Sequence, residues 1–126
     1  MNITITERGW PGHFICSSRC EFTRNTLISN GELNIIVSTV GAMMDIHISN
    51  ERRYEMVGLD RYYETMAFHA EYKEPYWDSD VTRQVSFNSP WYLPTIEFNS
   101  DALANDMHET VVKEITENIS ICNYDL

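Results

Sequence analysis

The clearest folding signal of this chain is the segment LISNGELNIIVSTV, residues 27–40. Asn-Gly stands between two segments rich in Ile, Val and Leu, and this dipeptide is typical of the type I′ turn that joins two antiparallel strands. Both central residues of that turn need positive φ, which Asn and Gly adopt at low cost. The segment therefore predicts a β-hairpin, with Gly41 closing its second strand.

A second strong signal lies at the C-terminal end. Apolar residues recur at every fourth position over residues 101–119, which predicts an amphipathic helix; they are Leu103, Met107, Val111, Ile115 and Ile119. Asn99, Ser100 and Asp101 precede this stripe and are residue types that cap helix N-termini. A hairpin followed by a helix predicts an α+β fold, in which the helix packs on one face of an antiparallel sheet.

The remaining segments read mostly as strands. Alternation of apolar and polar residues favours strands over residues 2–6, 22–26, 54–57 and 81–87. Residues 61–72 fit either a strand or a helix, and their aromatic content favours the strand. In that strand the even positions are apolar, with Glu64 as the exception. We find no repeat and no linker, so we expect one domain over residues 1–126.

Charge is the most informative feature of the composition. The 126 residues carry 19 acids, 9 bases and a formal net charge of -10, while 43% of the residues are hydrophobic. These values exclude global disorder and argue against neutralisation of nucleic-acid phosphates. The charge is uneven, because residues 1–62 sum to -1 and residues 63–126 to -9. The planar guanidinium favours carboxylate pairing, so we expect Arg52, Arg53 and Arg61 to contact acids.

The sequence also predicts a compartment. The first residues, MNITITE, lack a basic and apolar signal segment, and the longest aliphatic run is residues 35–37. Three cysteines are an odd and small number, which is typical of free thiols in a reducing cytosol. We therefore expect a cytoplasmic protein.

Acidic and aromatic residues interleave between residues 54 and 92. The stretch least typical of a core is EPYWDSD, residues 74–80, where two aromatic residues stand among carboxylates. Tyr and Trp dominate binding hot spots, and spaced carboxylates attract arginine-rich surfaces and can imitate a phosphate backbone. We expect a binding surface for a basic partner made of Glu71, Glu74, Tyr76, Trp77, Asp78 and Asp80, with Glu109 and Glu117 as secondary contacts. The competing interpretation is that about half of the aromatic residues fill the core.

The alternative hypothesis is a small zinc- or thiol-dependent enzyme, or a zinc-stabilised domain, centred on His13, Cys16 and Cys20, because imidazole and thiolate are the ligands that zinc prefers. The spacing H-x2-C-x3-C supplies three ligands and differs from the paired C-x2-C pattern. In the thiol-dependent alternative, one of these cysteines is a nucleophile and a histidine is its base. Asp78-x-Asp80 is a further candidate for a divalent cation. The chain has no phosphate loop, dinucleotide fingerprint or nucleophile elbow, so we assign no catalytic residue and no cofactor, and we expect a non-enzymatic protein.

The segments RGWPGHFIC (8–16), RNTL (24–27), STVG (38–41), RYYETMAF (61–68) and SPW (89–91) cover much of the chain. In these segments the sequence resembles a family of short proteins carried by phages and prophages. The resemblance implies a mobile-element context in a bacterial cytoplasm rather than an activity, so no functional residue is carried over. Small acidic phage proteins often bind and block a host defence complex, such as a CRISPR surveillance complex or a restriction enzyme, and we expect this role here. A phage assembly accessory is a third reading.

Overall fold

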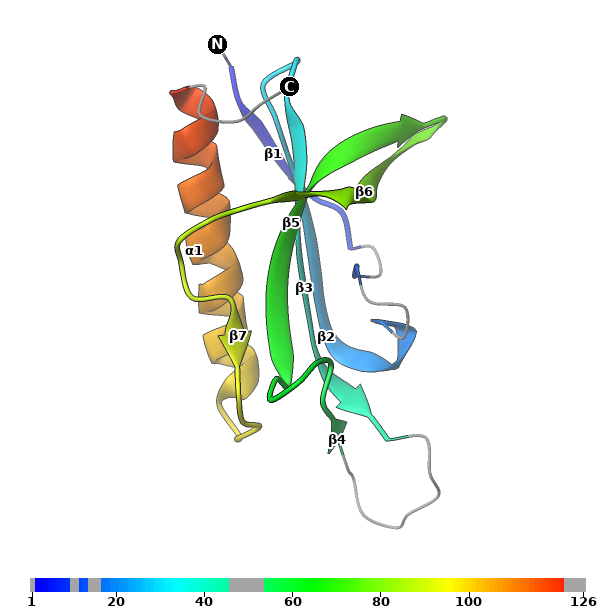
Figure 1. Cartoon of the computed structure of the whole chain (residues 1–126), viewed down its shortest axis with the longest axis vertical. Coiled ribbons are helices and arrows are strands. Elements are labelled where there is room, and N and C mark those ends of the chain that lie inside the picture. Colours follow the sequence, from blue (N-terminus) through cyan, green and yellow to red (C-terminus); the bar gives the residue numbers. More distant parts are fainter. Residues whose placement is uncertain (1, 10–11, 14–16, 46–53, 122–126) are drawn as a thin grey trace.

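The residues that the structure describes form one antiparallel sheet, with one α-helix packed against it (Figure 1). The computed structural model describes residues 2–9, 12–13, 17–45 and 54–121. The elements are, in chain order, β1 (Thr4–Glu7), the short 3-10 helix η1 (Ser17–Arg19), β2 (Cys20–Ser29), β3 (Asn34–Met44), β4 (Tyr54–Glu55), β5 (Tyr63–Lys73), β6 (Tyr76–Val85), β7 (Tyr92–Leu93) and α1 (Ser100–Ser120).

The strand order is β1-β2-β3-β5-β6, and every pairing is antiparallel. Short strand β4 pairs with β3, and β7 pairs with β5 beyond the end of β6. Helix α1 packs along one face and contacts β2, β3 and β5. The predicted α+β class, with a C-terminal helix on an antiparallel sheet, is confirmed in this form.

Strands β2 and β3 are antiparallel neighbours, but the predicted two-residue turn between them is not confirmed. Ser29 pairs with Asn34, so residues 30–33 form a four-residue connection. Only Gly31 of the dipeptide has positive φ, at 95°. The Oδ1 atom of Asn30 accepts the backbone N–H groups of Glu32 (2.9 Å) and Leu33 (2.7 Å). This Asx-type turn leaves no need for the positive φ that a type I′ turn demands of Asn30.

Gly41 does not end the second strand, since β3 continues to Met44. The preference for a strand over residues 61–72 is confirmed, because β5 spans Tyr63–Lys73. Helix α1 spans Ser100–Ser120, one residue longer at each end than the periodicity indicates. Leu103 departs from the predicted stripe, being 46% exposed, and the buried stripe begins at Ala104.

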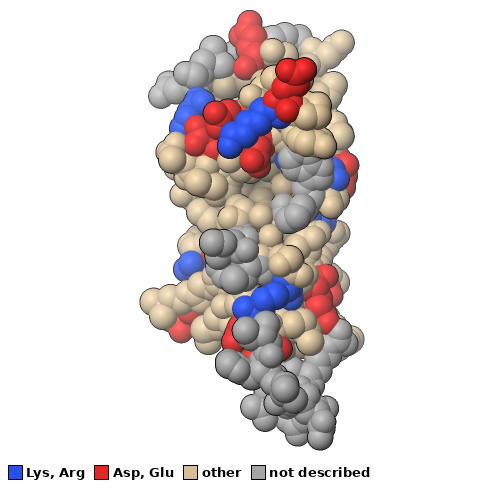
Figure 2. All heavy atoms as spheres, turned by 90° about the vertical axis from the view of Figure 1, so that its right-hand side faces the viewer, with Lys and Arg blue, Asp and Glu red and all other residues tan. Residues whose placement is uncertain are grey.

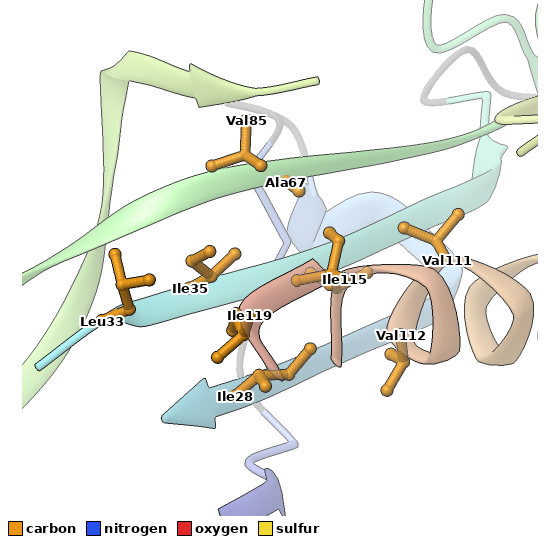
Figure 3. Close-up of a cluster of buried hydrophobic side chains, with 10 residues drawn as sticks. Ile28, Leu33, Ile35, Ala67, Val85, Val111, Val112, Ile115 and Ile119 are labelled. Carbon is orange, nitrogen blue, oxygen red and sulfur yellow. The ribbon is translucent and has the colours of Figure 1, made fainter. Parts of the chain in front are cut away.

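The core lies between the sheet and the helix. In β3 the side chains alternate, so Ile35 and Val37 face α1. Figure 3 shows Ile115 and Ile119 of α1 meeting Ile28 and Ile35 of the sheet. These four side chains have at most 1% of their surface exposed. Burying an isoleucine fully contributes about 1.5–3 kcal/mol relative to exposure, so this interface holds the helix on the sheet.

Candidate functional site

The β5–β6 hairpin brings together all six residues of the predicted acidic and aromatic surface. Glu71 pairs with Asp78, Tyr72 with Trp77 and Lys73 with Tyr76, and residues 74–75 form the connection. In Figure 1 this hairpin projects from the upper right of the sheet, away from α1. The register thus gathers these side chains on one protruding element.

The hairpin has two chemically different faces. Paired residues in an antiparallel ladder point to the same side, and successive residues point to opposite sides. Glu71, Lys73, Tyr76 and Asp78 therefore share one face, and Tyr72 and Trp77 the other. The Tyr72 and Trp77 rings pack with centroids 5.1 Å apart. Tyr72 and Tyr76 remain 56% and 58% exposed, as expected of side chains available for contact.

The charge of this hairpin is less one-sided than the acids alone indicate. The Nζ atom of Lys73 lies 4.0 Å from Glu71 Oε2 and 4.0 Å from Asp78 Oδ2. All three side chains are more than half exposed, so these pairs are weak. Figure 2, which looks at this side of the molecule, shows basic and acidic side chains mixed at the upper end. The surface is therefore mixed: Lys73 lies between two of its acids, Arg8 reaches the Trp77 carbonyl, and the charge of Arg83 acts on Asp80.

Two of the predicted contact residues also have a local structural role. Asp78 Oδ1 accepts the N–H of Ser79 at 2.9 Å, and Asp80 Oδ1 accepts the N–H and hydroxyl of Thr82 at 3.1 and 2.6 Å. The bonds from Thr82 hold the pKa of Asp80 below its usual range. The guanidinium of Arg8 donates to the Trp77 carbonyl. Three backbone groups of edge strand β6, the Trp77 carbonyl and the N–H groups of Ser79 and Thr82, are thus bonded within the chain.

The two acids predicted on the helix do not join the hairpin surface. Glu109 accepts a hydrogen bond from Arg24, which also binds Glu7 Oε2 at 2.7 Å. Glu117 is exposed. Figure 1 places α1 and the hairpin tip on opposite sides of the sheet, so one flat partner surface does not reach both.

His13 has no free ring nitrogen for a metal. Its Nδ1 lies 2.8 Å from Ser38 Oγ and its Nε2 3.0 Å from Glu64 Oε1. Cys20 pairs with Met43 in the sheet, and Ser38 and Met43 are separated by roughly 16 Å at the usual strand rise. The fold therefore does not bring His13 to Cys20, and Cys16 lies outside the described residues. Within the described ranges, no group of three or more His, Cys, Asp or Glu residues is arranged to hold a metal ion.

Ser38, His13 and Glu64 form a hydroxyl–imidazole–carboxylate chain, which is the residue set of a serine nucleophile. Ser38 has no exposed surface, and its Oγ also accepts the backbone N–H of His13 at 3.0 Å. A substrate atom has no access to this oxygen. These hydrogen bonds are structural and hold His13 on the face of the sheet opposite α1.

Glu64 connects this chain to Arg61, a cluster that the sequence reasoning did not foresee. Only 5% of Glu64 is exposed, and its Oε2 accepts the Nε–H of Arg61 at 2.9 Å. Burial raises the pKa of Glu64, but hydrogen bonds and charge from His13 and Arg61 outweigh it and lower that pKa overall. The guanidinium also lies over the Trp91 ring, 4.9 Å from its centroid. The expected pairing with an acid is confirmed for Arg61, whereas Arg52 and Arg53 lie outside the described residues. Glu64, the polar exception in its strand, was the available signal in the sequence.

A second buried polar cluster lies on the helix side. His108 has no exposed surface, and its two ring nitrogens lie 2.7 Å from the hydroxyls of Thr26 and Thr39. The Thr39 hydroxyl also forms a hydrogen bond of 2.6 Å with the Thr65 hydroxyl. Burial, followed by the charge of Arg24, lowers the pKa of His108 to about 4. The side chain is neutral at pH 7 and has no route to a ligand.

Comparisons with family models, curated proteins and solved structures give no match. No helix among the described residues is long and apolar enough to cross a membrane.

Proposed function

We propose that this protein is a non-enzymatic binding protein that presents its β5–β6 hairpin to a basic surface of a host protein complex that handles nucleic acid. The observation that carries the proposal is the protruding hairpin, on which exposed Tyr76 shares a face with Glu71 and Asp78. Glu74 lies in the connection at its tip, and exposed Tyr72 lies on the opposite face. A projecting element reaches into a groove that the body of the protein cannot enter. The phage resemblance favours a defence complex as the partner, and blocking its nucleic-acid surface is the proposed mode of inhibition.

The hairpin combines two sources of binding energy. The tyrosines supply large amphipathic contact area at low entropic cost, and the carboxylates steer a basic partner into place. Lys73 lies between Glu71 and Asp78 and repels a cation of the partner. An arginine of the partner therefore has to bind these carboxylates beside Lys73 and not at its position. Arginine suits this arrangement, since its planar fork binds a carboxylate through two hydrogen bonds.

Neutralising three hairpin acids is expected to remove partner binding without unfolding the protein. The variant is Glu74→Gln, Asp78→Asn and Asp80→Asn. Asparagine keeps the oxygen that caps Ser79 and Thr82, so only charge is lost. We expect a melting temperature within about 2 °C of wild type, since exposed charges contribute little to stability, and at least tenfold weaker binding. The measurement is quantitative capture of partner from bacterial lysate on immobilised protein, at low and high salt.

A matched control removes the same charge elsewhere. Glu32→Gln, Asp60→Asn and Asp106→Asn lie at exposed positions outside the hairpin. This control is expected to capture the same partner as wild type. Equal capture by the hairpin variant and the control, or equal loss in both, sinks the hairpin proposal, because binding then follows net charge or another surface.

A further inference from the structure

A notch opens in the sheet where β6 ends and β7 begins. Strand β5 pairs with Val85 through Ala67, and with Tyr92 through Glu64. Between these two partners the chain leaves the sheet and passes over α1, where the backbone N–H groups of residues 88 and 89 donate to Glu114. The notch forms an open pocket with a volume of about 370 Å³. Its walls include Arg61, Met66, Gln84, Phe87 and Trp91. This volume lies at the small end of ligand sites, which start near about 300 Å³.

Arg61 is held rigidly at this notch. Glu64 binds its Nε, and the Trp91 ring lies under its guanidinium. The guanidinium also lies against the backbone of Gly58, where an added Cβ would come within 2.3 Å of Nη2. A side chain fixed on three sides has already lost the rotamer freedom that binding normally costs. Glu64 is therefore a positioning residue for Arg61.

The guanidinium retains donors for a ligand. Arginine has five N–H groups, of which Nε–H binds Glu64 and Nη1 makes a long contact of 3.5 Å to the Leu59 carbonyl. Nη2 has no hydrogen-bond partner in the part of the chain that the structure describes. The Arg61 side chain is 28% exposed. Its remaining donors match the oxygens of a carboxylate or phosphate.

The other residues that line the notch favour an aromatic ring in the ligand. Met66 and Phe87 are half-buried, and Trp91 is 37% exposed. Thioether and aromatic groups provide favourable contact area for a planar apolar body. Gln84 and Ser86 stand at the rim and are exposed polar residues. A cation at one end and apolar walls beside it are complementary to an anionic group attached to a ring.

We infer that this notch is a binding site for a small planar aromatic ligand that carries a carboxylate or phosphate, with Arg61 binding the anionic group and Met66, Phe87 and Trp91 contacting the ring. The net charge of -10 opposes an anion at long range. At 0.15 M ionic strength the Debye length is about 8 Å, so the local contact with Arg61 decides the binding. The site is independent of the hairpin tip, and either proposal can fail without the other.

Methionine-methyl NMR tests the site directly. The chain has six methionines, and Met66 lines the notch. Benzoate and phenyl phosphate are titrated separately into ¹³C-methyl-labelled protein, with the Met66 signal assigned through Met66→Leu. We expect a saturable shift of the Met66 signal with a Kd of about 1 mM for at least one anion, and the tighter of the two identifies the anionic group. Benzamide, the neutral counterpart of benzoate, is expected to bind at least tenfold more weakly.

Variants then assign the anion contact. Arg61→Gln is expected to weaken binding at least tenfold, whereas Arg83→Gln removes a cation that does not line the notch and leaves the Kd unchanged. Arg61→Lys keeps the charge beside buried Glu64 and loses the planar fork, so it is expected to fold and to bind several-fold more weakly. The inference is overturned if neither anion shifts Met66 saturably up to 50 mM, a threshold on the order of 50 times the expected Kd. Equal binding of benzamide and benzoate, a comparison that needs no variant, also overturns it.

Discussion

Gly41→Ala is expected to destabilise the protein by about 3 kcal/mol or more, which is a large effect for one methyl group. A Cβ at this position would lie 2.0 Å from Cδ2 and 2.5 Å from Cγ of Tyr63. Tyr63 pairs with Gly41 across β3 and β5, is 3% exposed, and donates its hydroxyl to Asp101 Oδ1 at 2.6 Å. The ring is thus fixed at both ends and cannot move aside. Chemical denaturation with urea measures the loss.

Gly31→Ala serves as the matched control. Gly31 has positive φ, but an added Cβ would meet no atom within 4 Å. Backbone strain alone is expected to cost about 1 kcal/mol there. A double-mutant cycle with Tyr63→Leu separates the clash from other causes, because the smaller side chain should reduce the cost of Gly41→Ala. Equal destabilisation by the two glycine substitutions contradicts the explanation.

Lowering the pH from 7 to 5 is expected to reduce the free energy of unfolding by about 2 kcal/mol through His108. The pKa of His108 is about 4 in the folded protein and has an ordinary value of 6.5. The unfolded chain therefore binds a proton as the pH falls below 6.5, while the folded chain does not until about pH 4. Stability from this residue is complete above pH 6.5 and is lost on acidification, at about 1.4 kcal/mol for each pH unit.

His108→Gln isolates this contribution. Glutamine keeps an amide near Thr26 and Thr39 and does not titrate. Glu7, Glu64 and Glu114 have lowered pKa values, so their losses occur as the pH falls below the ordinary value of 4.5, outside the range from pH 7 to 5. Urea denaturation at several pH values should show a flatter profile for the variant. Parallel profiles for wild type and His108→Gln would falsify the assignment.

Local sequence predicted the elements whose signals repeat within a few residues. Residues 101–119 gave the helix because one period of four repeats along the whole segment, and burial of one stripe is the main source of helix stability. The strand over residues 61–72 was predictable from alternation and aromatic content. The turn at Asn30 was not, since its side chain could either tolerate positive φ or accept backbone N–H groups, and the wider loop uses the second option.

The same distinction between local and long-range information applies to the candidate binding residues. Six hairpin residues lie within ten positions of one another, so one register brings them together, and their grouping followed from the sequence. Glu109 and Glu117 are far along the chain, and the packing of α1 on one sheet face separates them from the hairpin. The zinc hypothesis treated His13 and Cys20 as neighbours because they are close in sequence, whereas the sheet directs them to different residues of β3.

The sequence by itself determined the class of the fold, the excess of acid after residue 62, and the acidic and aromatic character of the hairpin, because each depends on composition or on a short period. Only the tertiary structure decided that Arg61 stands rigid at a notch beside Trp91, and that His13 faces Glu64 from 51 positions away. Such contacts arise from strand order and from the packing of faces. They depend on the arrangement of the whole sheet, which no local period encodes.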